Sequence, residues 1–198
     1  MQTYIIKNQK DLNKFKDDYG YKIDGNAEFE YSAIFEGRLL VNGYLSIEAG
    51  GFIEAGGSIE AGGSIEAGGS IEAGGFIEAG GFIEAGGSIK ADEFIEAGGS
   101  IEAGEFIEAG DNYGISAVLS ITCKGKLKFG LKAFAGICTW KNISDQEKTI
   151  TCGKFEGGVI EYGVLIETGL PEEKMITLSN GKKVSESTII EALKGLVK

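Results

Sequence analysis

Residues 56–75 read GGSIEAGGSIEAGGSIEAGG, so one six-residue phrase occurs three times in succession. Isoleucine recurs every six residues from Ile47 to Ile107. Weaker copies continue this spacing toward the N-terminus, at Ile23, Phe29, Phe35 and Val41. A six-residue step turns an α-helix by about 600°, which scatters the isoleucines around its axis. Two glycines per copy would also cost a helix about 2 kcal/mol relative to alanine. The repeat therefore predicts extended chain.

In a strand, residues two apart point to the same side. We therefore expect each Ile, and the Gly two positions before it, to face inward, while Glu and the Ser or Phe beside Ile face outward. The remaining Ala-Gly pair is assigned to the corner, where glycine can adopt positive φ. Three sides close a triangular coil of about 18 residues, and coils stack about 4.8 Å apart. The chain is predicted to be all-β, with a single-chain triangular parallel β-solenoid.

Three regions are expected along the chain: an N-terminal cap over residues 1–22, the solenoid over 23–139 and a C-terminal module over 140–198. The cap contains a strand at residues 4–6 and a short helix over residues 9–18 that Asn8 caps. The repeat slips by two residues at 111–113 and then resumes. After the slip, the second inward position is expected to hold Leu119, Gly125, Leu131 and Ile137.

The C-terminal module predicts strands at residues 149–152 and 159–168, then a hairpin across Asn180 and Gly181. A helix that begins at Ser185 or Ser187 and ends at Val197 follows. Its apolar face is a predicted contact with the end of the solenoid or with a second copy in a homodimer. That face consists of Ile189, Ile190, Leu193, Leu196 and Val197.

The phrase Ile-Glu-Ala-Gly-Gly-Ser resembles the hexapeptide pattern of left-handed parallel β-helices. The run of I-E-A-G phrases after the N-terminal segment YIIKNQKDLNKF also resembles hexapeptide-repeat proteins of bacteriophages and prophages. This resemblance covers residues 4–140. It implies a left-handed coil and a phage or mobile-element origin, and therefore a place in the cytoplasm of a host cell.

The acidic charge is concentrated in the repeat. The formal net charge of the chain is −11, and between Ile47 and Gly110 thirteen acidic residues face a single cation, Lys90. With 18 residues per coil, the glutamates are expected to stack in three columns. The first column holds Glu48, Glu66, Glu84 and Glu102, the second Glu60, Glu78 and Glu96, and the third Glu54, Glu72, Lys90 and Glu108. Like charges about 5 Å apart repel by about 0.8 kcal/mol even in water.

Three explanations of these columns stay open. Evenly spaced carboxylates can imitate nucleic-acid phosphates and occupy a basic groove. They can instead serve only solubility, or they can bind calcium, although the Asp-rich turns of calcium-binding β-helices are missing. Outward Phe76 and Phe94 lie one coil apart and are predicted to stack beside the columns as part of a contact patch. A second, basic contact is considered at Lys124, Lys126, Lys128 and Lys132.

The composition argues against catalysis and against a membrane span. Acyltransferases and carbonic anhydrases built on hexapeptide helices depend on histidine, and this chain has none. Cys123, Cys138 and Cys152 form no C-x-x-C pair, so no metal or cofactor is expected. No apolar run approaches the roughly 18 residues of a membrane span, and the N-terminus lacks a secretory signal. A cytoplasmic, non-enzymatic protein is the expectation.

The preferred hypothesis is an acidic nucleic-acid mimic that inhibits a host defence nuclease, as an anti-CRISPR protein inhibits a CRISPR effector. Its partner would be a host protein with a basic nucleic-acid-binding surface, and direct binding of nucleic acid is not expected. The alternative is a structural role, in which solenoids join into dimers or into filaments of the bactofilin kind.

Overall fold

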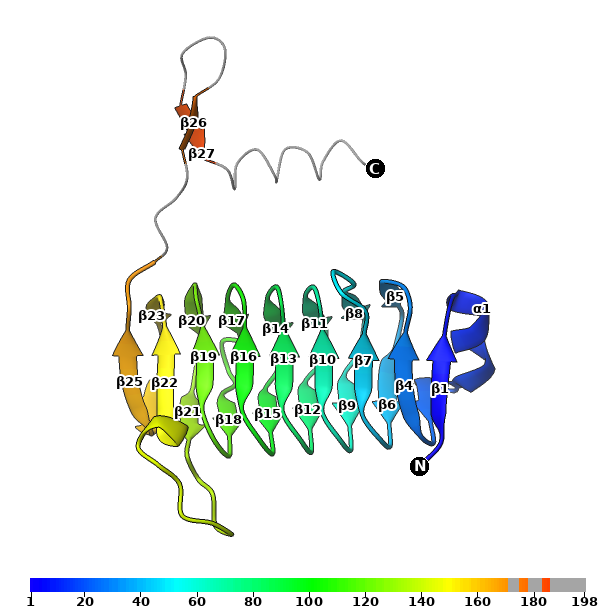
Figure 1. The fold of residues 1–198 in the computed structure, drawn as a ribbon, viewed down its shortest axis with the longest axis horizontal. Coiled ribbons are helices and arrows are strands. Elements are labelled where there is room, and N and C mark those ends of the chain that lie inside the picture. The colour runs from blue at the N-terminus through cyan, green and yellow to red at the C-terminus, as the bar shows by residue number, and fades with distance from the viewer. Residues whose placement is uncertain (171–174, 178–182, 186–198) are drawn as a thin grey trace.

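The computed structural model describes residues 1–170, 175–177 and 183–185, and most of its strands form three sheets around one core (Figure 1). The chain turns a corner after each strand and enters the next sheet, so one coil contributes one strand to each of the three sheets. All neighbouring strands pair in parallel, apart from β2 with β3 and β26 with β27. The predicted all-β solenoid is confirmed.

The sheets are named here A, B and C. Sheet A contains, in order, β1 (Thr3–Ile6), β4 (Asn26–Phe29), β7 (Leu45–Ile47), β10 (Ile65–Ala67), β13 (Ile83–Ala85), β16 (Ile101–Ala103), β19 (Ile121–Cys123), β22 (Thr149–Cys152) and β25 (Val164–Glu167). Sheet B contains β2 (Lys16–Asp17), β3 (Gly20–Ile23), β6 (Arg38–Val41), β9 (Ile59–Ala61), β12 (Ile77–Ala79), β15 (Ile95–Ala97), β18 (Ile115–Ala117), β21 (Lys132–Ala135) and β24 (Val159–Tyr162). Sheet C contains β5 (Ala33–Phe35), β8 (Ile53–Ala55), β11 (Ile71–Ala73), β14 (Ile89–Ala91), β17 (Ile107–Glu108), β20 (Lys126–Lys128) and β23 (Lys154–Glu156).

Each copy of the repeat forms a three-residue strand, Ile-Glu-Ala, whose first and third residues fill the core. Ile83 is completely buried and Ala85 is 3% exposed, while Glu84 between them faces solvent. The small inward residue is therefore Ala and not Gly, so the expected assignment of Ala to the corner is wrong. For the same reason Leu131 and Ile137, which we expected to face inward, are 55% and 41% exposed.

The paired glycines form the corners because, at most of them, two coils approach so closely that a Cβ atom would clash with the backbone of the preceding coil. A Cβ atom placed on Gly86 would lie 2.2 Å from the carbonyl oxygen of Gly68 in the preceding coil, and one on Gly80 would lie 2.2 Å from that of Gly62. Neither glycine has a positive φ. The expectation that these corners need positive φ is therefore wrong, and close backbone stacking is the reason for glycine.

The first coils follow a different frame from the regular repeat. Ile47 pairs with Ala67, and Leu45 pairs with Ile65, so this coil spans 20 residues instead of 18. The two additional residues form a turn in which Gly51 donates to the carbonyl oxygen of Glu48 and Gly50 adopts φ 81°. Ile47 therefore occupies the position that Ala takes later. In the first coils this position holds large apolar residues. Apolar residues therefore recur every six positions on both sides of the turn, and the sequence alone does not reveal that the frame changes there.

The N-terminal end of the core is covered by α1 (Gln9–Leu12) and the 3-10 turn η1 (Asn13–Phe15). The side chain of Asn8 accepts hydrogen bonds from the backbone of Lys10 and Asp11, as predicted for the cap. The helix ends earlier than residue 18 because Lys16 and Asp17 form β2 and pair antiparallel with β3. Leu12 is completely buried, so this segment closes the first coil.

The coils continue beyond the expected boundary at Thr139. After a loop that contains the 3-10 turn η2 (Gln146–Lys148), β22 to β25 add one further strand to sheets B and C and two to sheet A. The expected strand over residues 159–168 is divided at Gly163, where φ 121° turns the chain from sheet B to sheet A.

A separate antiparallel pair, β26 (Met175–Thr177) and β27 (Lys183–Ser185), agrees with the predicted hairpin. Its turn at Asn180 and Gly181 lies outside the described residues. The expected helix also lies outside them, with its predicted contact residues Ile189, Ile190, Leu193, Leu196 and Val197.

Candidate functional site

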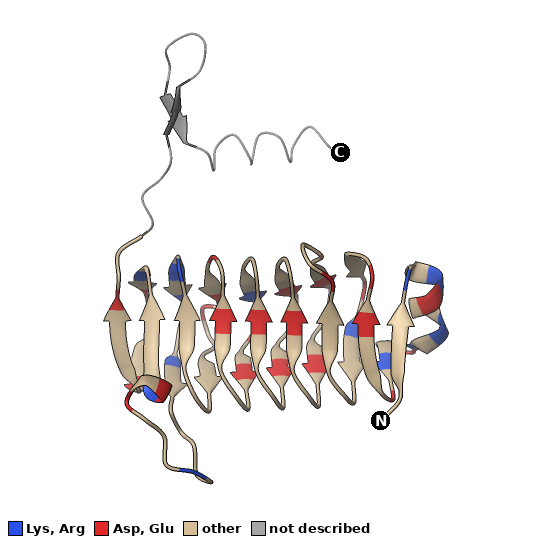
Figure 2. Ribbon diagram, viewed as in Figure 1, with Lys and Arg blue, Asp and Glu red and all other residues tan. Residues whose placement is uncertain are grey.

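The glutamates of the repeat form columns along the solenoid, because equivalent residues of successive coils lie in register (Figure 2). Column A on sheet A contains Glu66, Glu84 and Glu102. Column B on sheet B contains Glu60, Glu78 and Glu96. Column C on sheet C contains Glu54, Glu72, Lys90 and Glu108. The predicted columns B and C are confirmed.

The expectation that Glu48 belongs to column A is wrong. Ser46 is the residue that pairs with Glu66, and it also pairs with Glu28 on its other side. The two-residue turn after Ile47 moves Glu48 to an exposed corner. Column A therefore starts at Glu66, and Thr122 follows Glu102 at its other end.

The three columns differ in how their charge is compensated. In column C, Lys90 lies between Glu72 and Glu108, and the next residue in register, Lys128, binds Glu108 with 2.9 Å between Nζ and Oε1. In columns A and B, no glutamate has a salt bridge or a side-chain hydrogen bond within residues 1–170. Within residues 1–170, columns A and B are therefore two aligned rows of acidic side chains without a compensating partner.

The crowding of carboxylates has an electrostatic effect at the centre of column B. Partial burial, followed by repulsion from Glu60 and Glu96 on either side, raises the pKa of Glu78 above its ordinary value. Glu78 faces solvent, so salt and water screen this repulsion. The column is thus a feature that the fold tolerates at a small cost in stability.

Outward aromatic residues lie beside these columns, in the position before each Ile. Phe76 and Phe94 stack as predicted, with ring centroids 4.8 Å apart and planes inclined by 5°. Where Ser58, Ser64 or Ser70 takes the same position, its hydroxyl accepts a hydrogen bond from the backbone of the next coil, as Ser64 Oγ does from Phe82 at 3.2 Å. Phe and Ser alternatives therefore both fit the position.

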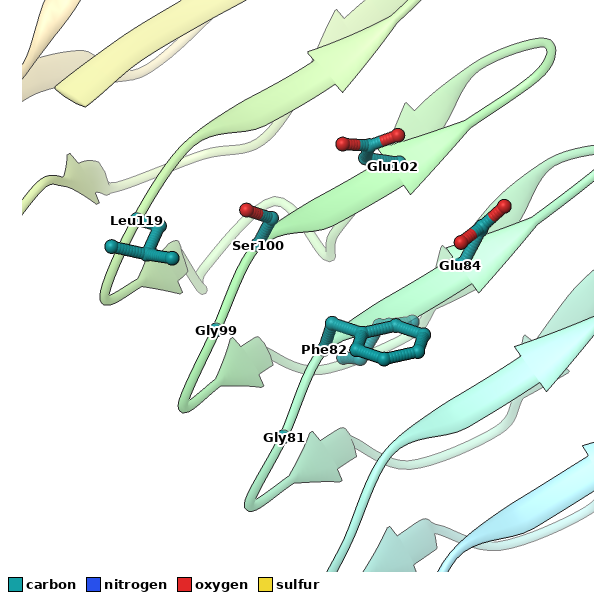
Figure 3. Close-up of a pocket in the computed structure, with 8 residues that line it drawn as sticks. Gly81, Phe82, Glu84, Gly99, Ser100, Glu102 and Leu119 are labelled. Carbon is teal, nitrogen blue, oxygen red and sulfur yellow. The ribbon is translucent and has the colours of Figure 1, made fainter. Parts of the chain in front are cut away.

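This alternation leaves two hollows on the surface that we did not foresee from the sequence. One, of about 420 Å³, lies on sheet A between Phe82 and Leu119, over Gly99 and Ser100 (Figure 3). The other, of about 300 Å³, lies on sheet B between Phe94 and Phe134. The sequence does not reveal the first hollow, because the repeat pattern places Leu119 in the interior. In the structure Leu119 occupies the position of the second corner glycine, and its backbone N–H donates a hydrogen bond to the carbonyl oxygen of Gly99 in the preceding coil.

The four lysines considered as a basic contact do not form one patch. Lys126 and Lys128 lie on sheet C, and Lys132 lies on sheet B. Three of the four are in salt bridges: Lys126 with Glu156 at 3.4 Å, Lys128 with Glu108, and Lys132 with Glu161 at 2.9 Å. Lys124 is exposed. The structure does not bring these residues together as a site.

The buried cysteines occupy core positions. Cys123 and Cys152 lie on the neighbouring strands β19 and β22, in the inward position that Ala holds in the repeat. Burial, with a smaller contribution from Cys152, raises the pKa of Cys123 to about 12, and burial also raises the pKa of Cys152 to about 11. Both thiols therefore stay protonated at neutral pH and pack as small apolar groups.

No group of three His, Cys, Asp or Glu side chains in the described part of the chain is arranged to hold a metal ion. The helices described here are also too short and too polar to span a membrane.

Parallel sheets, one strand per sheet in each coil and an Ile-Ala core define this chain as a repeat β-solenoid protein. A family model described as haemagglutinin repeat matches residues 25–89 and 79–129, which together span more than half of the chain. The protein belongs to the haemagglutinin-repeat family. No curated protein and no solved structure matches the chain significantly. The hexapeptide-repeat resemblance, with its left-handed coil and its phage origin, stays a prediction.

Proposed function

We propose that this protein is a non-enzymatic interaction protein, whose rigid acidic solenoid occupies the basic nucleic-acid-binding surface of another protein. The observation that carries the proposal is the pair of uncompensated glutamate columns on sheets A and B. An extended, parallel arrangement of carboxylates on a rigid body is suited to a groove that normally holds a phosphate backbone.

The charge density supports this proposal. Between Glu54 and Glu84 each coil carries three glutamates. With coils about 4.8 Å apart, the three sheets together place one carboxylate per about 1.6 Å of the solenoid axis, and columns A and B contribute two of every three. Duplex DNA carries one negative charge per about 1.7 Å of its axis. The similarity is one of charge density and not of helical geometry, so the partner would be a protein that holds nucleic acid mainly through its phosphates.

The concrete form of the proposal is an inhibitor of a host defence nuclease, of the anti-CRISPR kind, encoded by a phage or another mobile element and acting in the host cytoplasm. The resemblance of the I-E-A-G phrases to phage and prophage proteins supports this form together with the charge. No catalytic group is needed, because occupation of the nucleic-acid groove is itself inhibitory.

The test is competition with DNA. Labelled duplex DNA bound to candidate CRISPR effectors, and to an unrelated basic DNA-binding protein, is titrated with the wild type and with a column variant, Glu60→Gln/Glu78→Gln/Glu96→Gln. A matched control, Glu36→Gln/Glu48→Gln/Glu93→Gln, removes the same charge outside the columns, where these side chains make no salt bridge or hydrogen bond within the described residues.

The wild type is expected to displace DNA from a nuclease, the column variant to do so about tenfold less well, and the control to differ by less than about twofold. Raising the salt concentration should weaken the wild-type interaction most. Equal potency of the column variant and the control, or no displacement by the wild type, would contradict the proposal.

A second candidate function, self-assembly through the C-terminal end of the solenoid, is favoured by a different observation. The last core residues Phe155, Ile160 and Leu165 are only partly buried, and β25 has no further strand beside it among the described residues. Unpaired strand edges of this kind promote association. Sedimentation velocity over a wide concentration range distinguishes the two: a filament former grows with concentration, and an inhibitor of fixed size does not.

A further inference from the structure

The hollow of about 420 Å³ lies on sheet A, at the corner that leads from sheet B (Figure 3). Its floor is formed by Gly99 and the small side chain of Ser100, between Phe82 of the preceding coil and Leu119 of the following one. Phe82 is 40% exposed, so one face of its ring is available to a ligand. The hollow exists because a serine occupies a position that phenylalanine holds one coil earlier.

Two carboxylates stand at the edge of this hollow. Glu84 and Glu102 lie directly opposite each other on the neighbouring strands β13 and β16, and both project from the sheet beside the hollow (Figure 3). Both are exposed, and no lysine or arginine contributes to the lining. The apolar walls formed by Phe82 and Leu119, next to a double negative charge, are complementary to a cation that has an apolar stem.

The second hollow, on sheet B, differs from the first in its charge. It is walled by the aromatic side chains Phe94 and Phe134, but Glu96 is the one glutamate of its lining, and the Lys132 that also lines it is paired with Glu161 at 2.9 Å. A cation would be attracted less strongly there. Of these two hollows, the one at Phe82 therefore combines apolar contact with the stronger negative charge.

We propose that the hollow between Phe82 and Leu119 binds an arginine side chain of a partner protein, with the guanidinium group between Glu84 and Glu102. Guanidinium is planar, weakly hydrated and able to stack on a phenyl ring, and its fork of N–H donors can bind carboxylates on more than one side. Lysine has a compact and strongly hydrated charge, so it gains less from such a surface. This inference rests on the proposed function and names the side chain by which a basic partner is held.

The chain itself offers a variant that fills the hollow without changing its charge. Ser100→Phe places a phenyl ring next to Phe82 in the following coil, as Phe94 follows Phe76 on sheet B. Because the fold already accommodates such a pair, this variant is expected to keep the wild-type unfolding midpoint or to raise it. Glu84→Gln/Glu102→Gln removes the two charges, and Glu60→Gln/Glu78→Gln is its matched control on column B.

The probes are two short fluorescent peptides, one alternating glycine with arginine and the other glycine with lysine. Anisotropy measures their affinity, and the methyl NMR signals of Leu119 report whether the hollow is occupied. We expect the wild type to prefer the arginine peptide by about threefold. Ser100→Phe should abolish this preference. Glu84→Gln/Glu102→Gln should weaken arginine-peptide binding about tenfold, and the column B control should weaken it about twofold.

Two results would overturn the inference. If Ser100→Phe leaves the arginine preference and the Leu119 chemical-shift changes as in the wild type, the hollow is not the binding site. The same holds if Glu84→Gln/Glu102→Gln and Glu60→Gln/Glu78→Gln weaken arginine-peptide binding equally. Either result leaves a general attraction of the acidic columns for polycations intact. If neither peptide binds the wild type at low salt, the inference fails together with the proposed function.

Discussion

The rings of Phe76 and Phe94 lie almost parallel, with centroids 4.8 Å apart and planes inclined by 5°. This separation equals the distance between neighbouring strands of a sheet, about 4.8 Å. The residues stack because they occupy the same position in two coils that are 18 residues apart, as Ile77 and Ile95 beside them show by pairing directly. The same register that stacks the rings brings the glutamates into columns.

Phe94→Ser is expected to lower the free energy of unfolding by about 1 kcal/mol more than Phe82→Ser does, because it removes an aromatic pair that contributes roughly this amount beyond its buried area. Phe82→Ser is the control, since Phe82 has no aromatic partner among the described residues. Urea unfolding followed by circular dichroism measures both. An equal loss in both variants would show that ring burial alone, without stacking, accounts for the effect.

Gly86→Ala is expected to destabilise the protein by about 2 kcal/mol, because the new Cβ would lie 2.2 Å from the Gly68 carbonyl oxygen and force the coils apart. Gly56→Ala changes the equivalent corner glycine of another copy, where the nearest atom would be 3.5 Å away. That control should change stability by less than about 0.5 kcal/mol. Similar unfolding midpoints for the two variants would contradict the steric explanation of the corners.

The raised pKa of Glu78 predicts how stability depends on pH. The folded protein holds this proton more tightly than the unfolded chain, so the contribution of Glu78 is most favourable below its unfolded pKa and is lost as pH rises through the raised value. Glu78→Gln should therefore stabilise the protein at pH 7, by at most about 1 kcal/mol at low salt. The gain should disappear below about pH 4 and shrink as salt screens the charges.

Denaturant titrations of the wild type and Glu78→Gln at several pH values and salt concentrations measure this effect. Glu48→Gln serves as a control, because Glu48 lies at an exposed corner outside the columns. A gain at pH 7 that is equal for the two variants would indicate a general effect of net charge. A gain that persists at acidic pH would contradict the assignment to repulsion within column B.

Thiol labelling should separate the three cysteines. Cys123 and Cys152 are buried, and their raised pKa values of about 12 and about 11 keep them as thiols at pH 8. Cys138 is partly exposed. Brief iodoacetamide treatment of the folded protein followed by mass spectrometry should find one modification, at Cys138, and three after unfolding. Rapid labelling of Cys123 in the folded state would indicate that the coils around β19 open readily.

Much of the fold follows from the sequence by itself. The six-residue spacing of isoleucine excludes a helix and requires extended chain, and three sides of six residues give the 18-residue register that pairs Glu78 with Glu96 and Glu72 with Lys90. The stacking of Phe76 on Phe94 follows from the same count. These features depend on periodicity alone, which a repeating sequence displays directly.

Other features were decided only by the tertiary structure. Glu48 leaves its column because two residues form a turn after Ile47, and the apolar spacing passes through that turn unchanged. Ala rather than Gly faces inward because most corner glycines stack too closely on the preceding coil for a Cβ atom, which is a contact between coils and not a property of one copy. The hollow at Phe82 likewise depends on residues from three successive coils. Sequence periodicity determines which residues are equivalent, and packing between coils determines where they face.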